Sequence, residues 1–303
     1  MRAATDRPFG VNLFVPGAEM VSADELATYR RRLASDGARY GVEPGMPRED
    51  PGDDGWEDKL ALAVERGVPV ISFTFGCPPS DLIDDLHAAN SAVWVTVNNP
   101  DEAELAADAG ADVLTVQGIE AGGHQGGWLH RGEPDGYGLL ALIQVVRRRV
   151  ELPLVGAGGI GDGAAIAAVI AAGARAAQLG TAFLCSPEAG TDPTYRAALR
   201  AGGITRATRA FSGRLARGMN NRFITDHDSH APAAFPAVQQ MTGPLRAAAR
   251  AAGDPDGLSL WAGQAHALAA RDLPAGEIVR RLQADARRAA RAAADALGVD
   301  VGT

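Results

Sequence analysis

The first 185 residues alternate short runs of apolar, often β-branched residues with segments rich in alanine. The apolar runs cover residues 9–15, 68–75, 93–97, 112–117, 152–157 and 176–184. Between them, segments 100–109 and 162–172 begin at an acidic or helix-capping residue and stop before Gly110 and Gly173, as helices commonly do. This alternation predicts repeated βα units around a parallel sheet.

The strand pattern disappears at about Ser186, and the remainder consists of segments rich in Ala and Arg separated by Gly and Pro turns. We therefore predict a (β/α) barrel domain over residues 1–185 and a helical region over residues 186–303, with terminal helices that can return to the barrel. Segment 41–55 is dense in Gly, Pro and acidic residues and is predicted to be a loop. Segment 226–230 (DHDSH) contains metal-type ligands without helical i, i+4 spacing of its histidines, so we predict a solvated or lid loop and no metal site.

The composition is that of a globular protein that binds a small molecule. Among 303 residues, 46% are hydrophobic and 22% are charged, and 37 acidic against 29 basic side chains give a net charge of −8. This balance argues against nucleic-acid and anionic-membrane partners. The chain contains no apolar run of membrane-spanning length, and its first residues lack a signal-peptide pattern, so the predicted location is cytoplasmic. Cys77 and Cys185 are far apart and are predicted to be free thiols.

Two glycine turns follow neighbouring predicted strands. Segment 153–161 (PLVGAGGIG) formally satisfies the dinucleotide pattern G-x-G-x-x-G, but no acidic residue follows about 20 residues later, as ribose binding requires. The next strand ends in Gln178-Leu179-Gly180-Thr181. Because barrels commonly bind phosphate with the loops after two adjacent strands, we predict a phosphate site at Gly158, Gly159, Gly180 and Thr181. The alternative is a pair of tight βα turns without a ligand.

A glycine-rich loop after the strand at 112–117 carries the candidate catalytic residue. Segment 117–127 (QGIEAGGHQGG) surrounds His124 with five glycines, which makes the loop a poor way to pack a histidine into a core. An imidazole with an ordinary pKa near 6.5 can accept a proton near neutrality, so the predicted role is general base. The alternative is a structural histidine.

Several segments, in this order and spacing, resemble nitronate monooxygenases. They are GIEAGGHQGG, PLVGAGGIGDG and AAQLGTAFL, and the resemblance continues through GVNLFVP at 10–16, SFTFGCP at 72–78, TRAFSGRLARGMNNRF at 208–223 and LWAGQA at 260–265. The resemblance implies an FMN-dependent TIM-type (β/α) barrel covered by a helical domain. It also implies oxidation of alkyl nitronates, or of nitroalkanes, by molecular oxygen to carbonyl compounds and nitrite.

The resemblance also assigns roles to individual residues. The base corresponds to His124, in agreement with the loop argument. Residues expected to contact the flavin are Asn12, Thr96, Gln117, Gly122, Gly123, Gly158, Gly159, Gln178, Leu179, Gly180 and Thr181.

The chain departs from the family pattern at its start. Members usually begin with two further βα units before the GVNLFV strand, so we expect a barrel that lacks its first two units and has fewer than eight strands. Two other functions stay open: a flavin-dependent enoyl-thioester reductase, and a non-catalytic flavin- or phosphate-binding protein with a degenerate barrel. The predicted partners are a small substrate and oxygen, and a homodimer is one assembly open to such a protein.

Overall fold

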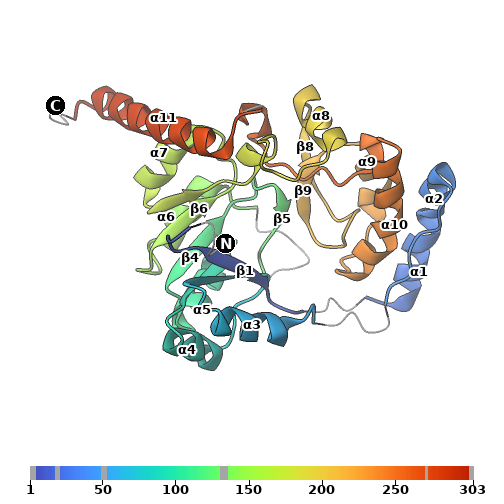
Figure 1. Ribbon diagram of the computed structural model, residues 1–303, viewed down its shortest axis with the longest axis horizontal. Helices are drawn as coiled ribbons and strands as arrows, with labels where there is room; N and C mark the ends of the chain where they lie inside the picture. The colour runs from blue at the N-terminus through green and yellow to red at the C-terminus, as the bar shows by residue number, and fades with distance from the viewer. Residues whose placement is uncertain (1–4, 18–20, 49–52, 130–135, 270–271, 300–303) are drawn as a thin grey trace.

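The computed structural model describes residues 5–17, 21–48, 53–129, 136–269 and 272–299. A curled, six-stranded parallel sheet forms its first layer, in the order β1-β2-β3-β4-β6-β7 (Figure 1). The strands are β1 Gly10–Phe14, β2 Val70–Thr74, β3 Ala92–Val97, β4 Val113–Gln117, β6 Leu154–Ala157 and β7 Ala176–Gln178. Five of them lie within predicted runs and β3 begins one residue before its run, so the predicted βα organisation is confirmed.

Helices cover the outer face of this sheet. They are α3 Trp56–Glu65, α4 Ser80–Ala88, α5 Pro100–Asp108, α6 Leu139–Val146 and α7 Gly163–Ala172. The strand residues that alternate toward them, such as Ile71, Phe73, Val95 and Leu114, are fully buried in one apolar cluster. The two helices predicted from capping signals are confirmed, with the Asn99 and Asp162 side chains accepting hydrogen bonds from the first turns of α5 and α7.

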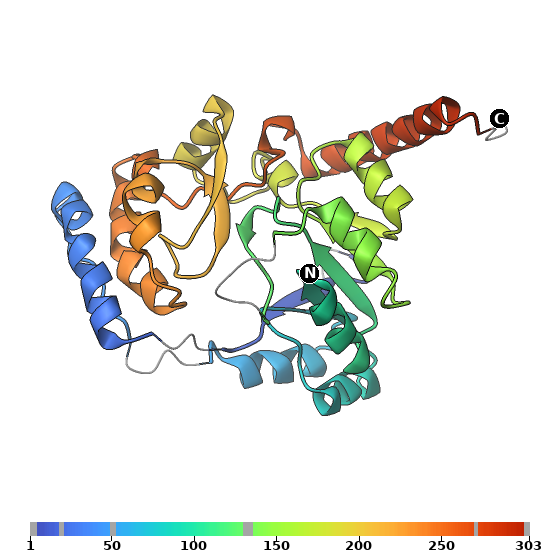
Figure 2. The same ribbon diagram turned by 180° about the vertical axis from the view of Figure 1, so that it is seen from behind.

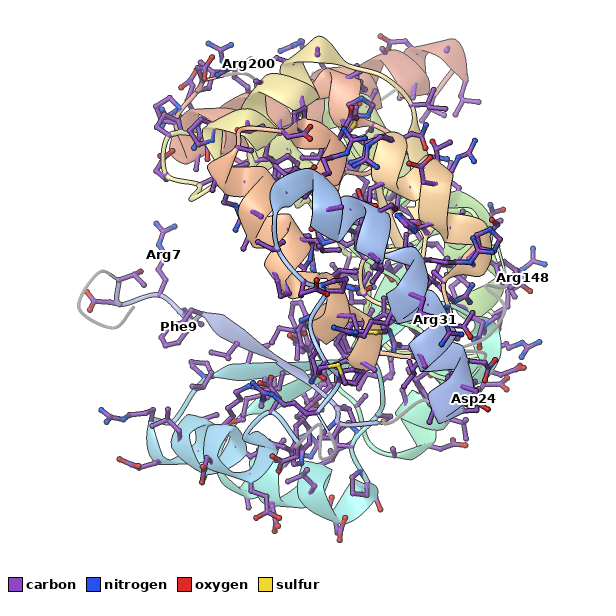
Figure 3. The ribbon with its side chains drawn as sticks, turned by 90° about the vertical axis from the view of Figure 1, so that its right-hand side faces the viewer. Arg7, Phe9, Asp24, Arg31, Arg148 and Arg200 are labelled. Atoms are coloured by element: carbon purple, nitrogen blue, oxygen red, sulfur yellow. The ribbon has the colours of Figure 1, made fainter. Side chains whose placement is uncertain are left out.

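The sheet is a half-barrel within the described residues. Strands β1 and β7 are its two edges, so the prediction of fewer than eight barrel strands is confirmed. The inner face of β1 is open, and Phe14 is 52% exposed. Figure 3 shows the beginning of β1, with Phe9 and Arg7, projecting from the edge of the sheet.

A second, three-stranded antiparallel sheet joins the two halves of the molecule. It pairs β5 Gly123–His124 with β9 Ala216–Met219 and β9 with β8 Thr205–Thr208. The prediction that strands end at Ser186 was therefore wrong. The sequences TRAT and ARGM are short and carry no alternating apolar pattern, so pairing with distant segments forms these strands rather than local propensity.

The strand predicted over 176–184 was too long. Strand β7 ends at Gln178, and a short 3₁₀ helix, Thr181–Phe183, follows the turn at Gly180. The apolar composition of 182–184 predicted a continuing strand because it does not distinguish a strand from a buried helical turn.

Helices from early and late parts of the sequence form the second half of the molecule. Here α1 Ala23–Arg32 and α2 Ala34–Tyr40 lie beside α10 Ala237–Ala251 (Figure 2), and near them are α8 Pro193–Ala201 and α9 Arg222–His227. Tyr29 and Leu33 pack in the same apolar cluster as Phe211, Phe223 and Met241. The division of the chain at residue 185 stays a prediction. It did not anticipate that α1 and α2, which lie between β1 and α3 in the sequence, pack with the second half of the molecule.

The chain ends in α11, Ala275–Ala296, which packs along α7 on the barrel side (Figure 1). None of the helices in the described ranges has the length and apolar character needed to cross a membrane.

The buried carboxylate of Asp36 connects α2 to α9. Asp36 is 1% exposed; its Oδ1 lies 2.7 Å from Arg222 Nη2 and its Oδ2 lies 2.7 Å from His227 Nε2. Burial opposes the charge of this carboxyl, but the hydrogen bonds from His227 and Arg222 outweigh it and lower its pKa. The prediction of a solvated or lid loop at 226–230 was therefore wrong for His227, because its partner lies 191 residues earlier in the chain.

We expect Asp36→Ala to destabilise the protein by about 3–5 kcal/mol at neutral pH, because it leaves the buried His227 and the partly buried Arg222 without their carboxylate. Asp226→Ala is the matched control: Asp226 pairs with the same Arg222 but is 49% exposed, and its loss should cost under about 1 kcal/mol. Since the folded pKa of Asp36 is lowered, its contribution is present above the unfolded value and is lost as the pH falls below about 4. Urea unfolding at several pH values measures this, and equal losses in the two variants would contradict it.

Candidate active site

A small pocket lies at the carboxyl ends of β4, β6 and β7. Its volume is about 140 Å³, which suits a phosphate group rather than a whole cofactor. Segment 260–265, far along the chain, closes it with Gly263 and Ala265. The structure gathers here the predicted site residues Gln117, Gly122, Gly158, Gly159, Gln178, Leu179, Gly180 and Thr181.

The backbone requires a glycine at one position of this pocket and tolerates a side chain at another. Gly158 has φ +107°, and a Cβ there would lie 2.9 Å from the backbone of Ala121, so a side chain would strain the turn. Gly180 has an ordinary backbone conformation, and a Cβ there would meet nothing within 4 Å. A larger residue at Gly180 is therefore compatible with the fold and would fill open space beside the pocket.

The Thr181 hydroxyl ties the pocket to segment 260–265. Its Oγ1 accepts a hydrogen bond from the Gly263 N–H at 3.0 Å, which leaves the hydroxyl hydrogen to be donated to an anion. Sequence reasoning did not assign Gly263 to the site. The LWAGQA motif contained it, but no local pattern indicates that a turn 82 residues later contacts Thr181.

His124 lies in a second, larger cavity of about 510 Å³. It is held on β5 by pairing with Ala216 of β9. Its ring centroid is 6.0 Å from that of Phe75, 5.9 Å from that of Phe235 and 5.4 Å from that of Trp261. The neighbours of the imidazole ring are thus largely aromatic. Phe75 and Phe235 line the cavity together with Phe14, Arg214 and Gln239.

The surroundings of His124 disfavour its charged form. Burial, then the positive charges of Arg214 and Arg246, lower its pKa to about 4. Arg214 is buried with its guanidinium 3.8 Å above the Phe75 ring, and its Nε donates to the Gln125 carbonyl at 3.2 Å. At neutral pH His124 is therefore an uncharged imidazole that can accept a proton.

Gln117 connects the glycine pocket to the loop that carries His124. It lines the glycine pocket, while its Nε2 donates to the His124 carbonyl at 3.1 Å and its Oε1 accepts from the Gly126 N–H at 2.7 Å. Asn98 Nδ2 donates to the same Oε1 at 2.9 Å. The side-chain amide therefore fixes the loop that carries His124.

The remaining predicted flavin contacts lie outside the glycine pocket. Asn12 and Thr96 are joined through Thr74: Thr74 Oγ1 is 3.0 Å from Asn12 Oδ1 and 3.1 Å from Thr96 Oγ1, which forms a polar row across β1, β2 and β3. Gly123 pairs with Arg217 in the small sheet at φ +80°. Their roles as cofactor contacts stay predictions.

Comparison with known proteins agrees with these motifs. A family model described as nitronate monooxygenase matches residues 1–285. This chain belongs to the nitronate monooxygenase family. A nitronate monooxygenase from Paraburkholderia phytofirmans is 40% identical over 294 residues, which cover 95% of this chain and 80% of that protein.

Solved structures match as well. A nitroalkane oxidase from Streptomyces ansochromogenes matches with a TM-score of 0.90 and 47% identity, covering 96% of this chain and 84% of that one. FabK from Thermotoga maritima is more distant, with a TM-score of 0.72, 26% identity and coverage of 96% and 79%. The resemblance stated from the sequence and the TIM-barrel fold class are confirmed.

We expect His124 to stay uncharged between about pH 8 and pH 5, where an ordinary histidine with a pKa near 6.5 changes from neutral to charged. NMR titration of its ring nitrogens measures this. Arg246→Gln removes one of the positive charges and should raise the pKa. Arg250→Gln is the control, since Arg250 lies one turn further along α10 and is 61% exposed. Titration of wild-type His124 near 6.5, or equal effects of the two variants, would overturn this electrostatic description.

Proposed function

We propose that this chain is an FMN-dependent enzyme that oxidises alkyl nitronates, and nitroalkanes after loss of their α-proton, with molecular oxygen to carbonyl compounds and nitrite. One observation carries the proposal. In a chain of the nitronate monooxygenase family, the uncharged His124 lies in a substrate-sized cavity, and Gln117, which lines the glycine pocket, donates a hydrogen bond to the His124 carbonyl.

The residues of the glycine pocket fit the FMN phosphate. Backbone N–H groups and a hydroxyl can bind an anion at a strand end without a formal positive charge. Gly158, Gly159, Gly180 and Thr181 would hold the phosphate, and the polar row from Asn12 to Thr96 offers hydrogen-bonding groups on the inner face of the half-barrel. When bound, the flavin supplies the electron transfer and the reaction with oxygen.

The His124 cavity fits a small, partly apolar anion. Phe14, Phe75 and Phe235 provide aromatic surface for an alkyl chain, while Arg214 provides positive charge for nitro oxygens. His124 would take the α-proton of a neutral nitroalkane. Because its pKa is about 4, it is a weak base, and the same positive field favours substrates that arrive already ionised as nitronates.

An assay on FMN-loaded protein tests the proposed reaction. Oxygen uptake and nitrite release with propane-2-nitronate, without pyridine nucleotide, are expected. Rapid NADPH oxidation with an enoyl thioester would instead support the reductase. Failure to bind FMN would support a degenerate barrel, the second alternative. The cytoplasmic location and the homodimer stay predictions.

The role of His124 predicts a split between two forms of one substrate. His124→Asn keeps polarity and approximate size but removes the basic nitrogen, so oxidation of neutral 2-nitropropane should fall by about 10²–10⁴-fold. Propane-2-nitronate has already lost the α-proton, and its oxidation should fall far less. Steady-state rates on FMN-loaded wild type and variant measure both. Equal losses would assign the imidazole a binding role, and no loss on either substrate would make it structural.

A further inference from the structure

Ser212 is the hydrogen-bond partner of the His124 ring. Its Oγ lies 2.9 Å from His124 Nε2, and this is the hydrogen bond that the ring makes among the described residues. Ser212 is 2% exposed, and it follows Phe211 at the start of the turn that leads to Arg214. The TRAFSGRLARGMNNRF motif contained this serine, but nothing in the sequence alone assigned it a role.

The backbone of Arg214 determines how the Ser212 hydroxyl is used. The hydroxyl donates its hydrogen to the Arg214 carbonyl at 3.1 Å, since a carbonyl oxygen can only accept. The same oxygen accepts from the Arg214 N–H at 3.3 Å. A hydroxyl has one hydrogen, so it presents a lone pair to the imidazole.

With the hydroxyl hydrogen donated to the Arg214 carbonyl, the imidazole donates at Nε2. We propose that Ser212 is a positioning residue that holds His124 in the Nε2–H tautomer and so makes Nδ1 the proton-accepting atom. This inference rests on the proposed function for its catalytic consequence. The tautomer itself can be measured without turnover.

The proton transfer is balanced within these groups. The α-C–H bond of a nitroalkane breaks, its electron pair stays on the substrate to form the nitronate, and the proton goes to Nδ1. The imidazolium that results keeps its Nε2–H donated to Ser212 Oγ, which becomes a charge-assisted hydrogen bond. Ser212 thereby stabilises the imidazolium in a cavity where Arg214 and Arg246 disfavour it. The other charged groups that line this cavity are Arg48, Asp53 and Asp54.

Nitrogen NMR on protein labelled with ¹⁵N-histidine, loaded with FMN at neutral pH, tests the tautomer directly. The His124 signals are identified by their loss in His124→Asn. We expect a pyrrole-type shift for Nε2 and a pyridine-type shift for Nδ1. In Ser212→Ala the two shifts should move toward each other, because the tautomer that carries its hydrogen on Nδ1 becomes populated. A proton on Nδ1 in the wild type would overturn the proposal.

Kinetics provide the second readout. Ser212→Ala should lower kcat for neutral 2-nitropropane by about tenfold with a smaller change in KM, because an unpaired buried donor replaces a hydrogen bond. Ser212→Thr keeps the hydroxyl and should recover most of the loss. The control is Ser91→Ala: Ser91 is also 2% exposed and donates to a carbonyl, that of Val68, at 2.8 Å.

The possible outcomes distinguish the positioning role of Ser212 from the proposed function. Unchanged shifts and unchanged kcat in Ser212→Ala, or an equal loss of kcat in Ser91→Ala, would reject Ser212 as a positioning residue. If FMN-loaded wild type oxidised no nitro compound, the proposed function would fail while the NMR result still decided the tautomer. If Ser212→Ala did not fold, the wild-type spectrum and Ser212→Thr would still decide the question.

Discussion

The parallel pairing of β4, β6 and β7 is the constraint on which the site depends. Gln117, Ala157 and Gln178 are paired in register, so three strands end at one level and their loops leave the sheet side by side. Two of these loops supply the glycine turns of the small pocket. The third, after β4, crosses to the second half of the molecule, where His124 pairs with β9. The backbone hydrogen bonds between these strands thus set the position of both the glycine pocket and His124.

Polar side chains then hold the crossing loop in place. The Gln117 side chain donates a hydrogen bond to the His124 carbonyl and accepts one from the Gly126 N–H. The fully buried carboxylate of Glu102 accepts hydrogen bonds from the Leu129 N–H at 2.9 Å and the Asn98 N–H at 2.8 Å. Buried polar groups of this kind stabilise one arrangement because a broken bond would leave a charge or an amide without a partner. A loop rich in glycine is thereby fixed well enough to present an imidazole.

Much of this arrangement was predictable from local pattern. The six strands and the capped helices followed from periodicity, and the glycine turns at 158–159 and 180 lie together because adjacent parallel strands end together. Strands β8 and β9 were not predictable, since TRAT and ARGM form strands only through pairing. Contacts between distant residues, such as Asp36 with His227, Thr181 with Gly263 and Ser212 with His124, have no local signal. The low pKa of His124 likewise depends on burial and on the charges of Arg214 and Arg246, which only the fold brings about.

Fluorescence titration of FMN into Gly180→Leu tests most directly whether the half-barrel presents an intact FMN phosphate site. Gly180 has an ordinary backbone conformation with open space around it, so the variant should fold normally while its side chain obstructs the pocket. Gly190→Leu is the control, since Gly190 also has open space around it but does not line the pocket. We expect at least about tenfold weaker FMN binding, or about 1.4 kcal/mol, for Gly180→Leu alone, with both variants melting like the wild type. Unchanged FMN affinity in a folded Gly180→Leu protein would contradict it.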